Sequence, residues 1–165
     1  MIDITIDDVI EVIAGSLSLL IDDEIIRANI NRVPPPLDSF ILLTEIGIYD
    51  LSTPKIELNR NNNSSNISTN TRIDIQIDFY GPRAGDKCKA IKTFIRSSYG
   101  YNSMPYNINP LFCSDGIQSP LISGEQQYVT RWILTASFQY NPSIDVPQYY
   151  SESIIPYIHN INEIY

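Results

Sequence analysis

The first apolar residues of the chain recur at the spacing of an α-helix. Thr5 and Asp8 form a capping-box-like start, in which each side chain can bond the backbone of the other. At about 100° per residue, one arc collects the apolar side chains Ile6, Val9, Ile10, Ile13, Leu17 and Leu20. The opposite side carries the acids Asp7, Asp8 and Glu11. The pattern predicts an amphipathic helix that ends near Ile21.

Four later stretches have the composition of β-strands. They are apolar, partly β-branched and bounded by turn-forming residues, and they cover residues 25–33, 40–49, 71–80 and 126–140. The clearest is 71–80, where Ile73, Ile75, Ile77 and Phe79 alternate with polar residues, which predicts one core face and one solvated face. The long strand 126–140 has one apolar face and a second face that is only half polar. We expect prolines 34–36 to end the first strand, because proline cannot donate to a β-ladder.

A second helix is predicted after the Gly81-Pro82 turn. Pro82 suits its first turn, Gly100 suits its end, and one apolar stripe joins Ala84, Cys88, Ile91 and Ile95. Residues 101–120 are expected to be irregular. The polar residues 59–71 predict a mobile loop tip between two strands of a long hairpin. The proline- and tyrosine-rich residues 142–165 predict an extended arm.

Helices and strands are segregated along the chain rather than strictly alternating. This order favours an α+β fold: a mostly antiparallel sheet with two helices packed on one face, a long hairpin and an extended C-terminal arm. The length of 165 residues suits one domain with an ordinary hydrophobic core. We expect that domain to cover residues 1–146 and the arm to cover residues 147–165.

Charge and composition narrow the functional classes. The chain has 11 basic and 19 acidic residues and a net charge of −8, which argues against a sequence-independent grip on nucleic acid. No run of 18 apolar residues occurs, so no membrane span is predicted, and the N-terminus lacks the basic segment of a secretory signal. The cysteines Cys88 and Cys113 cannot build a disulfide framework or a zinc site alone. We expect both to pack as small hydrophobic residues in a reducing compartment.

Candidate chemistry is sparse. The one histidine, His159, has no readable nucleophile or carboxylate beside it, so a small hydrolase that uses His159 is only a remote alternative. The acidic groups at 22–24 and on the first helix do not ensure the converging oxygens that a hard cation needs. No phosphate loop, nucleophile elbow or paired-histidine motif occurs. We therefore expect no catalytic residue, no metal site and no cofactor.

Interaction surfaces are the better candidates. The second helix gathers five of the 11 basic residues, which are Arg83, Lys87, Lys89, Lys92 and Arg96. Two interpretations stay open. These residues form a solvated exterior, or they face the acidic residues Asp7, Asp8 and Glu11 of another copy by charge complementarity.

Two further segments are candidate contacts. The 59–71 loop, with Asn62 and Asn63, is either a solvated tip or a segment that orders on a partner. The arm, with Tyr149 and Tyr150, and the half-apolar strand face indicate more apolar surface than two helices cover. Either another copy covers this surface, or the arm folds back over its own sheet.

Several sequence blocks occur in a distinctive order. They are RVPPP (32–36), DFYGPRAGD (78–86), NPLF (109–112), PLISGEQQY (120–128), RW (131–132) and QYNP (139–142). In this order and spacing the chain resembles the neck terminator (tail terminator) proteins of tailed bacteriophages. The resemblance runs from about residue 5 to the tail, and it is most specific from Phe79 to Asp86 and from Gly124 to Pro142.

This resemblance implies a virion structural protein with no catalytic residues and no cofactor. Family members form a ring, typically a hexamer, between the head-side connector and the tail tube; they end tail growth and join tail to head. The implied partners are further copies of the chain, the head connector or adaptor, and the tail tube protein, with the sheath as a further candidate. The expectation that goes with this resemblance is that DNA passes through the lumen without specific binding, that no membrane is involved, and that assembly takes place in the bacterial host cytoplasm. A head-side adaptor or stopper of the neck is the alternative.

Overall fold

The computed structural model describes residues 2–28, 39–105, 107–119, 121–122 and 128–148. These residues form an α+β fold, as the sequence predicted, with mostly antiparallel strands. The described helices are α1 (Ile6–Leu17), α2 (Ala84–Ile95) and α3 (Ser98–Asn102). The described strands are β1 (Glu24–Arg27), β2 (Phe40–Asp50), β3 (Lys55–Asn59), β4 (Ser64–Ser68), β5 (Thr71–Tyr80), β6 (Ile108–Cys113), β7 (Ile117–Gln118), β8 (Leu121–Ile122), β9 (Tyr128–Val129), β10 (Arg131–Tyr140) and β11 (Ser143–Pro147).

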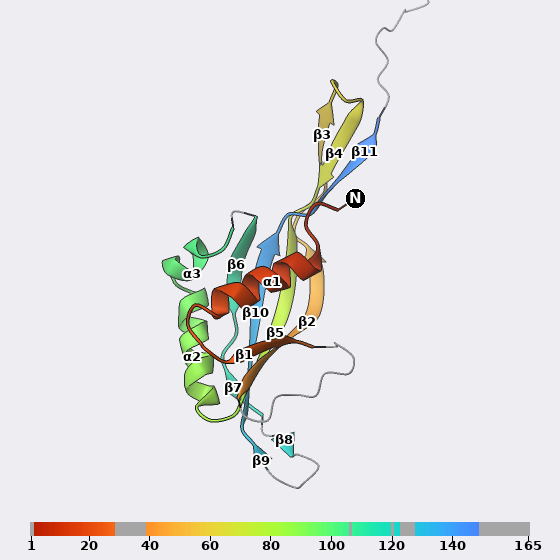
Figure 1. Ribbon diagram of the computed structural model, residues 1–165. Coiled ribbons are helices and arrows are strands. Elements are labelled where there is room, and N and C mark those ends of the chain that lie inside the picture. Colours follow the sequence, from red (N-terminus) through yellow and green to blue (C-terminus); the bar gives the residue numbers. More distant parts are fainter. Residues whose placement is uncertain (1, 29–38, 106, 120, 123–127, 149–165) are drawn as a thin grey trace, which may run out of the picture.

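The body of the molecule is a six-stranded sheet of order β1-β2-β5-β10-β6, with β7 also pairing β10 (Figure 1). Within it β1 and β2 are parallel, and the other described pairs are antiparallel. The central strand β5 pairs β2 on one side and β10 on the other over its whole length. Its alternating sequence suits this position, because β5 needs one apolar face for the core.

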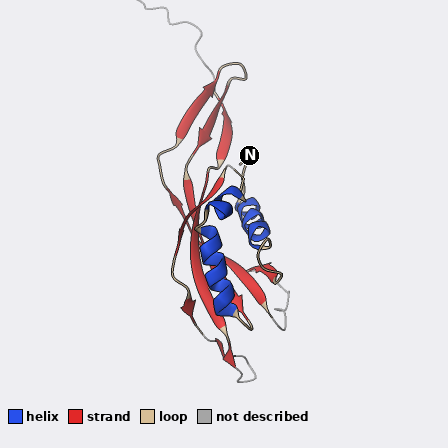
Figure 2. Cartoon of the chain, turned by 90° about the vertical axis from the view of Figure 1, so that its left-hand side faces the viewer, coloured by secondary structure: helices blue, strands red, loops and turns tan. Residues whose placement is uncertain are grey.

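The core lies between this sheet and the helices, which cover one face of it (Figure 2). The predicted core residues of β5 (Ile73, Ile75, Ile77 and Phe79) are fully buried. The predicted apolar stripe of α2 (Ala84, Cys88, Ile91 and Ile95) is buried too, as are Val9, Ile10, Ile13 and Leu17 of α1. The two periodicities in the sequence, near two and near 3.6 residues, therefore locate the core correctly.

The predicted long hairpin is present, but its polar tip is much shorter than residues 59–71. Strands β3 and β4 pair with each other, so the tip shrinks to residues 60–63, and β4 takes five residues of the segment that we expected to be a loop. β11 joins β4 on its other side, giving a second sheet of order β11-β4-β3. We call this three-stranded sheet the blade, because it projects beyond the end of the body (Figure 1). Local composition assigned the polar residues of β4 to a loop. In the structure their backbone N–H and C=O groups are satisfied by pairing with β3 and β11.

The helices differ from the sequence prediction at their ends. α1 ends at Leu17 rather than near Ile21, and Leu20 is exposed instead of joining the apolar stripe. α2 ends at Ile95, and Gly100, the predicted stop, lies inside α3. Pro82 precedes α2 rather than forming its first turn, since Arg83 is the N-cap residue.

Other predicted boundaries also change. Residues 101–120, expected to be irregular, include part of α3 together with β6 and β7. The short strands β6 and β7 pair with β10. Their local sequence pattern for a strand is weak, but pairing with β10 holds them in the extended conformation. The long strand predicted at 126–140 is broken at Thr130 into β9 and β10. Of the strand predicted at 25–33, only residues up to 28 are described, and the prolines 34–36 lie outside the described residues.

Candidate interaction surfaces

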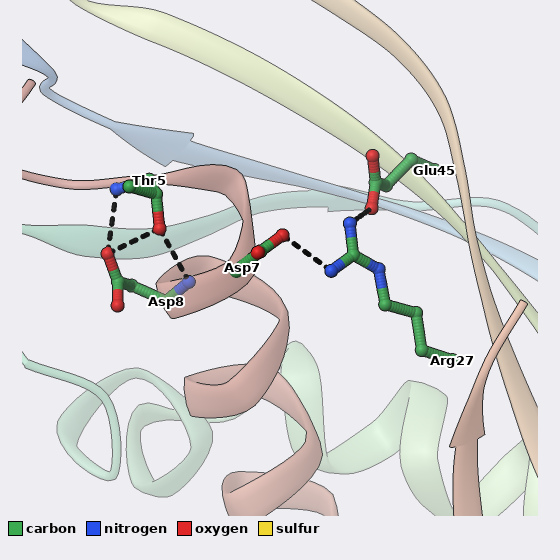
Figure 3. Close-up of polar contacts among 5 residues, drawn as sticks. All are labelled: Thr5, Asp7, Asp8, Arg27 and Glu45. Atoms are coloured by element: carbon green, nitrogen blue, oxygen red, sulfur yellow. Dashed lines mark hydrogen bonds and ion pairs between the residues drawn. The ribbon is translucent and has the colours of Figure 1, made fainter. Parts of the chain in front are cut away.

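The acidic residues of α1 are engaged within the chain (Figure 3). Thr5 and Asp8 form the predicted capping box: the Thr5 backbone N–H donates to Asp8 Oδ2 at 2.8 Å, and the Asp8 N–H donates to Thr5 Oγ1 at 3.2 Å. The Thr5 hydroxyl also donates to Asp8 at 2.6 Å, and these bonds lower the pKa of the Asp8 carboxyl. Asp8 therefore has a local structural role in starting the helix.

Arg27 connects the helix to the sheet. Its Nη1 donates to Asp7 Oδ1 at 2.5 Å, and its Nη2 donates to Glu45 on β2 (Figure 3). The bond to Asp7 and the one to Glu45 raise the pKa of the guanidinium. Of the three α1 acids proposed for contact between copies, only Glu11 has no bonding partner among the described residues.

Most of the basic residues of α2 are paired within the chain as well. Lys87 Nζ donates to Asp23 Oδ2 at 2.5 Å and to the Ser39 hydroxyl at 2.6 Å. Lys92 pairs with Asp115, which lowers the pKa of that carboxyl. These contacts tie α2 to the segments before β1 and β7.

The other basic residues of α2 face solvent. Arg83 pairs with Asp86 at 3.3 Å, where both side chains are largely exposed, so this pair adds little stability. Lys89 and Arg96 form no ion pair among the described residues, and both are exposed. The helix therefore offers less free charge to a partner than its sequence indicated. Whether it contacts another copy stays a prediction.

A groove of about 360 Å³ lies between the C-terminal end of α2, α3 and strand β6. Besides two serines it is lined by Ile95, Arg96, Tyr101, Pro110, Leu111 and Phe112, and we call it the rim groove. Phe112 is 65% exposed, and Leu111 and Tyr101 are about half exposed. β6 ends the strand order of the sheet, so the rim groove runs along a sheet edge. Sequence analysis missed it, because residues 101–120 were expected to be irregular.

The blade carries a second exposed apolar surface. Strand pairing places Ile56, Ile67 and Ile144 in one row. In the next row of the same face Leu58 and Val146 lie on either side of the buried Ser65. Ile2 bridges to Ile144 at the edge, and together these six apolar residues form the blade face. Ile56 is 60% exposed and Leu58 is 55% exposed. The alternation Lys-Ile-Glu-Leu-Asn at 55–59 was the sequence signal for this surface, and it was overlooked beside the polar segment that follows.

The sheet face opposite the helices carries a polar network instead of a solvated row. Asp78 is only 1% exposed; it accepts from Arg131 Nη2 at 3.1 Å and from Gln76 Nε2 at 2.9 Å. Next along the sheet, the Ser137 hydroxyl donates to Asp74 at 2.6 Å. The predicted solvated side of β5 is therefore partly closed by its own side chains. On the described part of this face, Arg72 pairs with Asp74 and Arg131 pairs with Asp78.

The cysteines are packed as predicted. Cys88 and Cys113 are both buried and free, and burial raises the pKa of the Cys113 thiol to about 11 and raises that of Cys88. Such thiols stay protonated and unreactive at neutral pH. Within the described residues no group of three or more histidines, cysteines or acids is placed to hold a metal ion.

The hairpin tip gives its asparagines a local role. Asn63 adopts a left-handed conformation with φ of 47°, which asparagine tolerates better than most residues, and its carbonyl accepts from the Gln148 N–H at 2.8 Å. Asn62 lies exposed in the same turn. Tyr149, Tyr150 and His159 lie outside the described residues. No described helix is long and apolar enough to cross a bilayer.

A comparison with protein families identifies the family of this chain. The family model for phage neck terminator proteins matches residues 5–164, nearly the whole chain. The chain belongs to this family. A search of curated proteins found no match. The match confirms the resemblance drawn from the sequence blocks, and it assigns this neck terminator to a family of virion structural proteins.

Proposed function

We propose that this neck terminator assembles as a ring, a homohexamer, at the junction between the phage head and tail. In this position it caps the finished tail tube, stops further growth and offers the surface that joins the tail to the head connector or adaptor. The observation that carries the proposal is the family match over residues 5–164. A ring is built from surfaces that contact other protein chains, and the described residues offer exposed surfaces of this kind.

The exposed apolar surfaces support self-assembly. A monomeric soluble protein rarely leaves large contiguous apolar patches in water, and such patches commonly mark protein interfaces. Among the described residues, Tyr101, Leu111 and Phe112 are exposed at the rim groove, and Ile2, Ile56 and Leu58 are exposed on the blade face. A structural protein that acts by contact with copies of itself and with neighbouring neck and tail proteins accounts for both.

The charge balance supports a lumen that passes DNA without holding it. The net charge of −8 repels phosphate on average, so the free energy of non-specific binding stays small. Arginines such as Arg72 and Arg131 on the open sheet face are paired with acids of the same face. DNA moving past such surfaces meets no array of unpaired cations.

Loss of the protein in an infected host tests this function. Removal of the gene is expected to give tails that are overlong or remain unjoined to heads, seen by electron microscopy of lysates. Heads that fill and then leak their DNA, beside tails of normal length, would instead assign a head-side stopper. Complementation with the wild-type gene is the control for both outcomes.

Mixing purified components tests the ring directly. The full chain is expected to form rings visible by negative stain, alone at high concentration or after tail tube protein is added. The experiment with added tail tube protein is needed as well, because the family resemblance implies that a terminator can stay monomeric until it meets a tube. A strict monomer in both arms would contradict the proposal.

A further inference from the structure

We propose that residues 149–165 of one copy, which we call the C-terminal segment, pack on the blade face of the next copy, so that exchanged segments close the ring. This inference rests on the proposed ring function and names a contact that holds neighbouring copies together. The receiving surface consists of described residues, the blade face defined above. The occupant is inferred from its sequence and from the place where the described chain ends, at Gln148.

The blade face continues the core face of the main sheet. The pairing of β10 with β5 joins Tyr140 to Thr71, and the pairing of β11 with β4 joins Ser143 to Ser68, which is the same offset. Side chains alternate along a strand, so an unchanged offset keeps the apolar side in step across the break. Along the body the helices cover this side, whereas no described helix covers the blade (Figures 1 and 2).

The two faces of the blade differ in what they can contact. On the blade face Ile56 is 60% exposed and Leu58 is 55% exposed. On the opposite face the Asn66 amide donates to the Ser143 hydroxyl at 3.1 Å and to Asp145 Oδ1 at 3.0 Å, so polar groups there are bonded within the chain. An apolar partner therefore suits the blade face, because exposed aliphatic side chains commonly mark protein interfaces.

The described chain ends beside the hairpin tip, at the far end of the blade from the body (Figure 1). Gln148 follows β11; its backbone N–H donates to the Asn63 carbonyl at 2.8 Å, and its side-chain oxygen accepts from the Ser65 hydroxyl. These bonds fix the point from which the C-terminal segment starts. Its 17 residues span about 56 Å when fully extended, which is far enough to reach a neighbouring copy.

The C-terminal segment has the composition of an apolar cover. Its only charged residues are two glutamates, and it lies almost wholly within the family match, which ends at residue 164. Tyrosine and aliphatic side chains bring large apolar areas to an interface. Nine of the 17 residues are tyrosine or isoleucine: Tyr149, Tyr150, Ile154, Ile155, Tyr157, Ile158, Ile161, Ile164 and Tyr165.

The reach of the segment favours the next copy over its own blade. Residues 149–155 contain no glycine, proline, asparagine or aspartate, the residue types that most favour a chain reversal, and the first of them is Pro156. At about 3.3 Å per residue, a reversal at Pro156 comes about 23 Å past the tip, and the residues that follow measure about 30 Å. That leaves about 7 Å to cover strands that are about 16 Å long. The segment therefore cannot cover the blade face of its own copy.

Exchange of this kind builds a ring. Each copy gives one segment and receives another on a different surface, so the contact is heterologous and repeats around an axis until it closes. A closed ring covers every blade face, whereas an open row of copies leaves one blade face bare at its end. Burial of the last exposed apolar surface thus favours closure.

Introduced cysteines test which surfaces meet. In the full chain, Leu58→Cys places a thiol on the blade face and Ile158→Cys places one in the C-terminal segment. The control replaces Leu58→Cys by Glu57→Cys, because Glu57 is the exposed neighbour of Leu58 on the opposite face. Burial raises the pKa of the native Cys88 and Cys113 thiols, so a short bismaleimide cross-linker reacts with the introduced ones.

The double variant Leu58→Cys/Ile158→Cys is expected to give a ladder of covalent oligomers that ends at the size of the ring. Cross-linking is carried out on rings assembled alone or with tail tube protein, and the products are separated on a denaturing gel. Below the concentration of ring assembly, the same variant is expected to stay uncross-linked. The control Glu57→Cys/Ile158→Cys should give no ladder. Negative stain confirms the rings, and circular dichroism checks the fold.

A charge in the C-terminal segment gives a second measurement. Ile158→Asp places a carboxylate at an apolar position, and Asn160→Asp places the same charge two residues away at a polar position. Ile158→Asp is expected to raise the protein concentration needed for ring assembly about tenfold, because it removes apolar area from the contact. Asn160→Asp should assemble like wild type. Native mass spectrometry over a dilution series measures both variants.

The outcomes separate this inference from the proposed function. Rings in which Leu58→Cys/Ile158→Cys gives no ladder would overturn the exchange and leave the ring function standing. A cross-link within one chain would show that the segment covers its own blade, and a product that stops at a dimer would show a pairwise exchange; either would overturn the inference. Equal effects of Ile158→Asp and Asn160→Asp would do the same.

Two further outcomes concern the tail tube protein. A Leu58→Cys thiol that becomes protected from maleimide only when tube protein is added, with no ladder in the double variant, would assign the blade face to the tube and overturn the exchange. Wild type that stays monomeric even with tube protein would overturn both the ring and the exchange.

Discussion

At the scale of single residues, two glycines show that the surroundings of a position decide what an added side chain would do. A Cβ at Gly100 would lie 2.2 Å from the carbonyl oxygen of Phe94, a backbone atom that cannot move aside, so glycine is required there. Gly15 lies inside α1, where a Cβ would meet nothing within 4 Å. The sequence marks both as glycine and gives no hint of this difference.

The two glycines should respond to alanine with opposite signs. Gly100→Ala is expected to destabilise the protein by about 1–3 kcal/mol, the usual cost of overpacking. Gly15→Ala is expected to stabilise it by about 0.5–1 kcal/mol, because glycine disfavours a helix interior. Urea unfolding of both variants measures the two changes, and a loss of stability in Gly15→Ala would contradict the description of α1.

Two arginine–aspartate pairs also differ through their surroundings, because one aspartate is buried and the other is exposed. Asp78 is buried beside Arg131, whereas Asp86 and its partner Arg83 are largely exposed. Asp78→Ala is expected to cost about 3–5 kcal/mol, because it leaves Arg131 without its partner in a half-buried site. Asp86→Ala is expected to cost about 1 kcal/mol or less. Urea midpoints measure both, and equal losses would contradict the burial of the Asp78 pair.

At the scale of elements, local signals fix helix starts better than helix ends. The Thr5–Asp8 capping box was readable because both partners are three residues apart, and the structure confirms it. The end of α1 was misplaced because the apolar Leu20 continues the helical period with nothing to pack against. The end of α2 was misplaced because Gly100, a residue type that commonly stops helices, lies inside α3 instead. Strand β4 was missed for the converse reason, since its polar residues become a strand only through pairing with β3 and β11.

The capping box predicts a specific pH dependence. Its bonds lower the pKa of Asp8, so their contribution to stability is complete above the unfolded value of about 3.9 and is lost as pH falls through the folded value. Asp8→Asn should therefore be less stable than wild type near pH 6, and the difference should shrink below about pH 4. Urea midpoints from pH 3 to 6 measure it. Glu11→Gln, which changes the same charge away from the cap, is the control; a difference constant with pH would contradict the role of Asp8.

At the scale of the whole molecule, the fold divides into a covered body and an uncovered blade. The body strands β5 and β10 are central and packed beneath helices, while every residue of β3 is exposed. Several hydrogen bonds join the two parts: Leu51 N–H donates to the Asn70 carbonyl at 2.8 Å, and Thr69 N–H donates to the Pro142 carbonyl at 3.2 Å. The segment before α1 adds a bond from Asp3 N–H to the Ser143 carbonyl at 3.1 Å. Local stability is therefore expected to differ between the two parts.

Hydrogen exchange should reveal this division. In the monomer, amides of β3 and β4 are expected to exchange much faster than those of β5 and β10, because the blade buries little apolar area. Peptide-resolved mass spectrometry of the full chain measures the rates, with the exposed hairpin tip 60–63 as the fast reference. Equal protection in β4 and β5 would contradict the view of the blade as the less stable part.

The order of the sequence blocks along the chain carried the family resemblance. Periodicity and local chemistry determined further features from sequence alone: the α+β class, the buried stripes of β5 and α2, and the helix cap. These features depend on neighbours within a few residues, where side-chain direction follows directly from the spacing. The blade, the rim groove and the pairing of α1 and α2 charges with Arg27, Asp23 and Asp115 were decided only by the tertiary structure. Each of these features joins segments that are far apart in the chain. A local sequence pattern does not indicate which distant strand or charged side chain will be the partner.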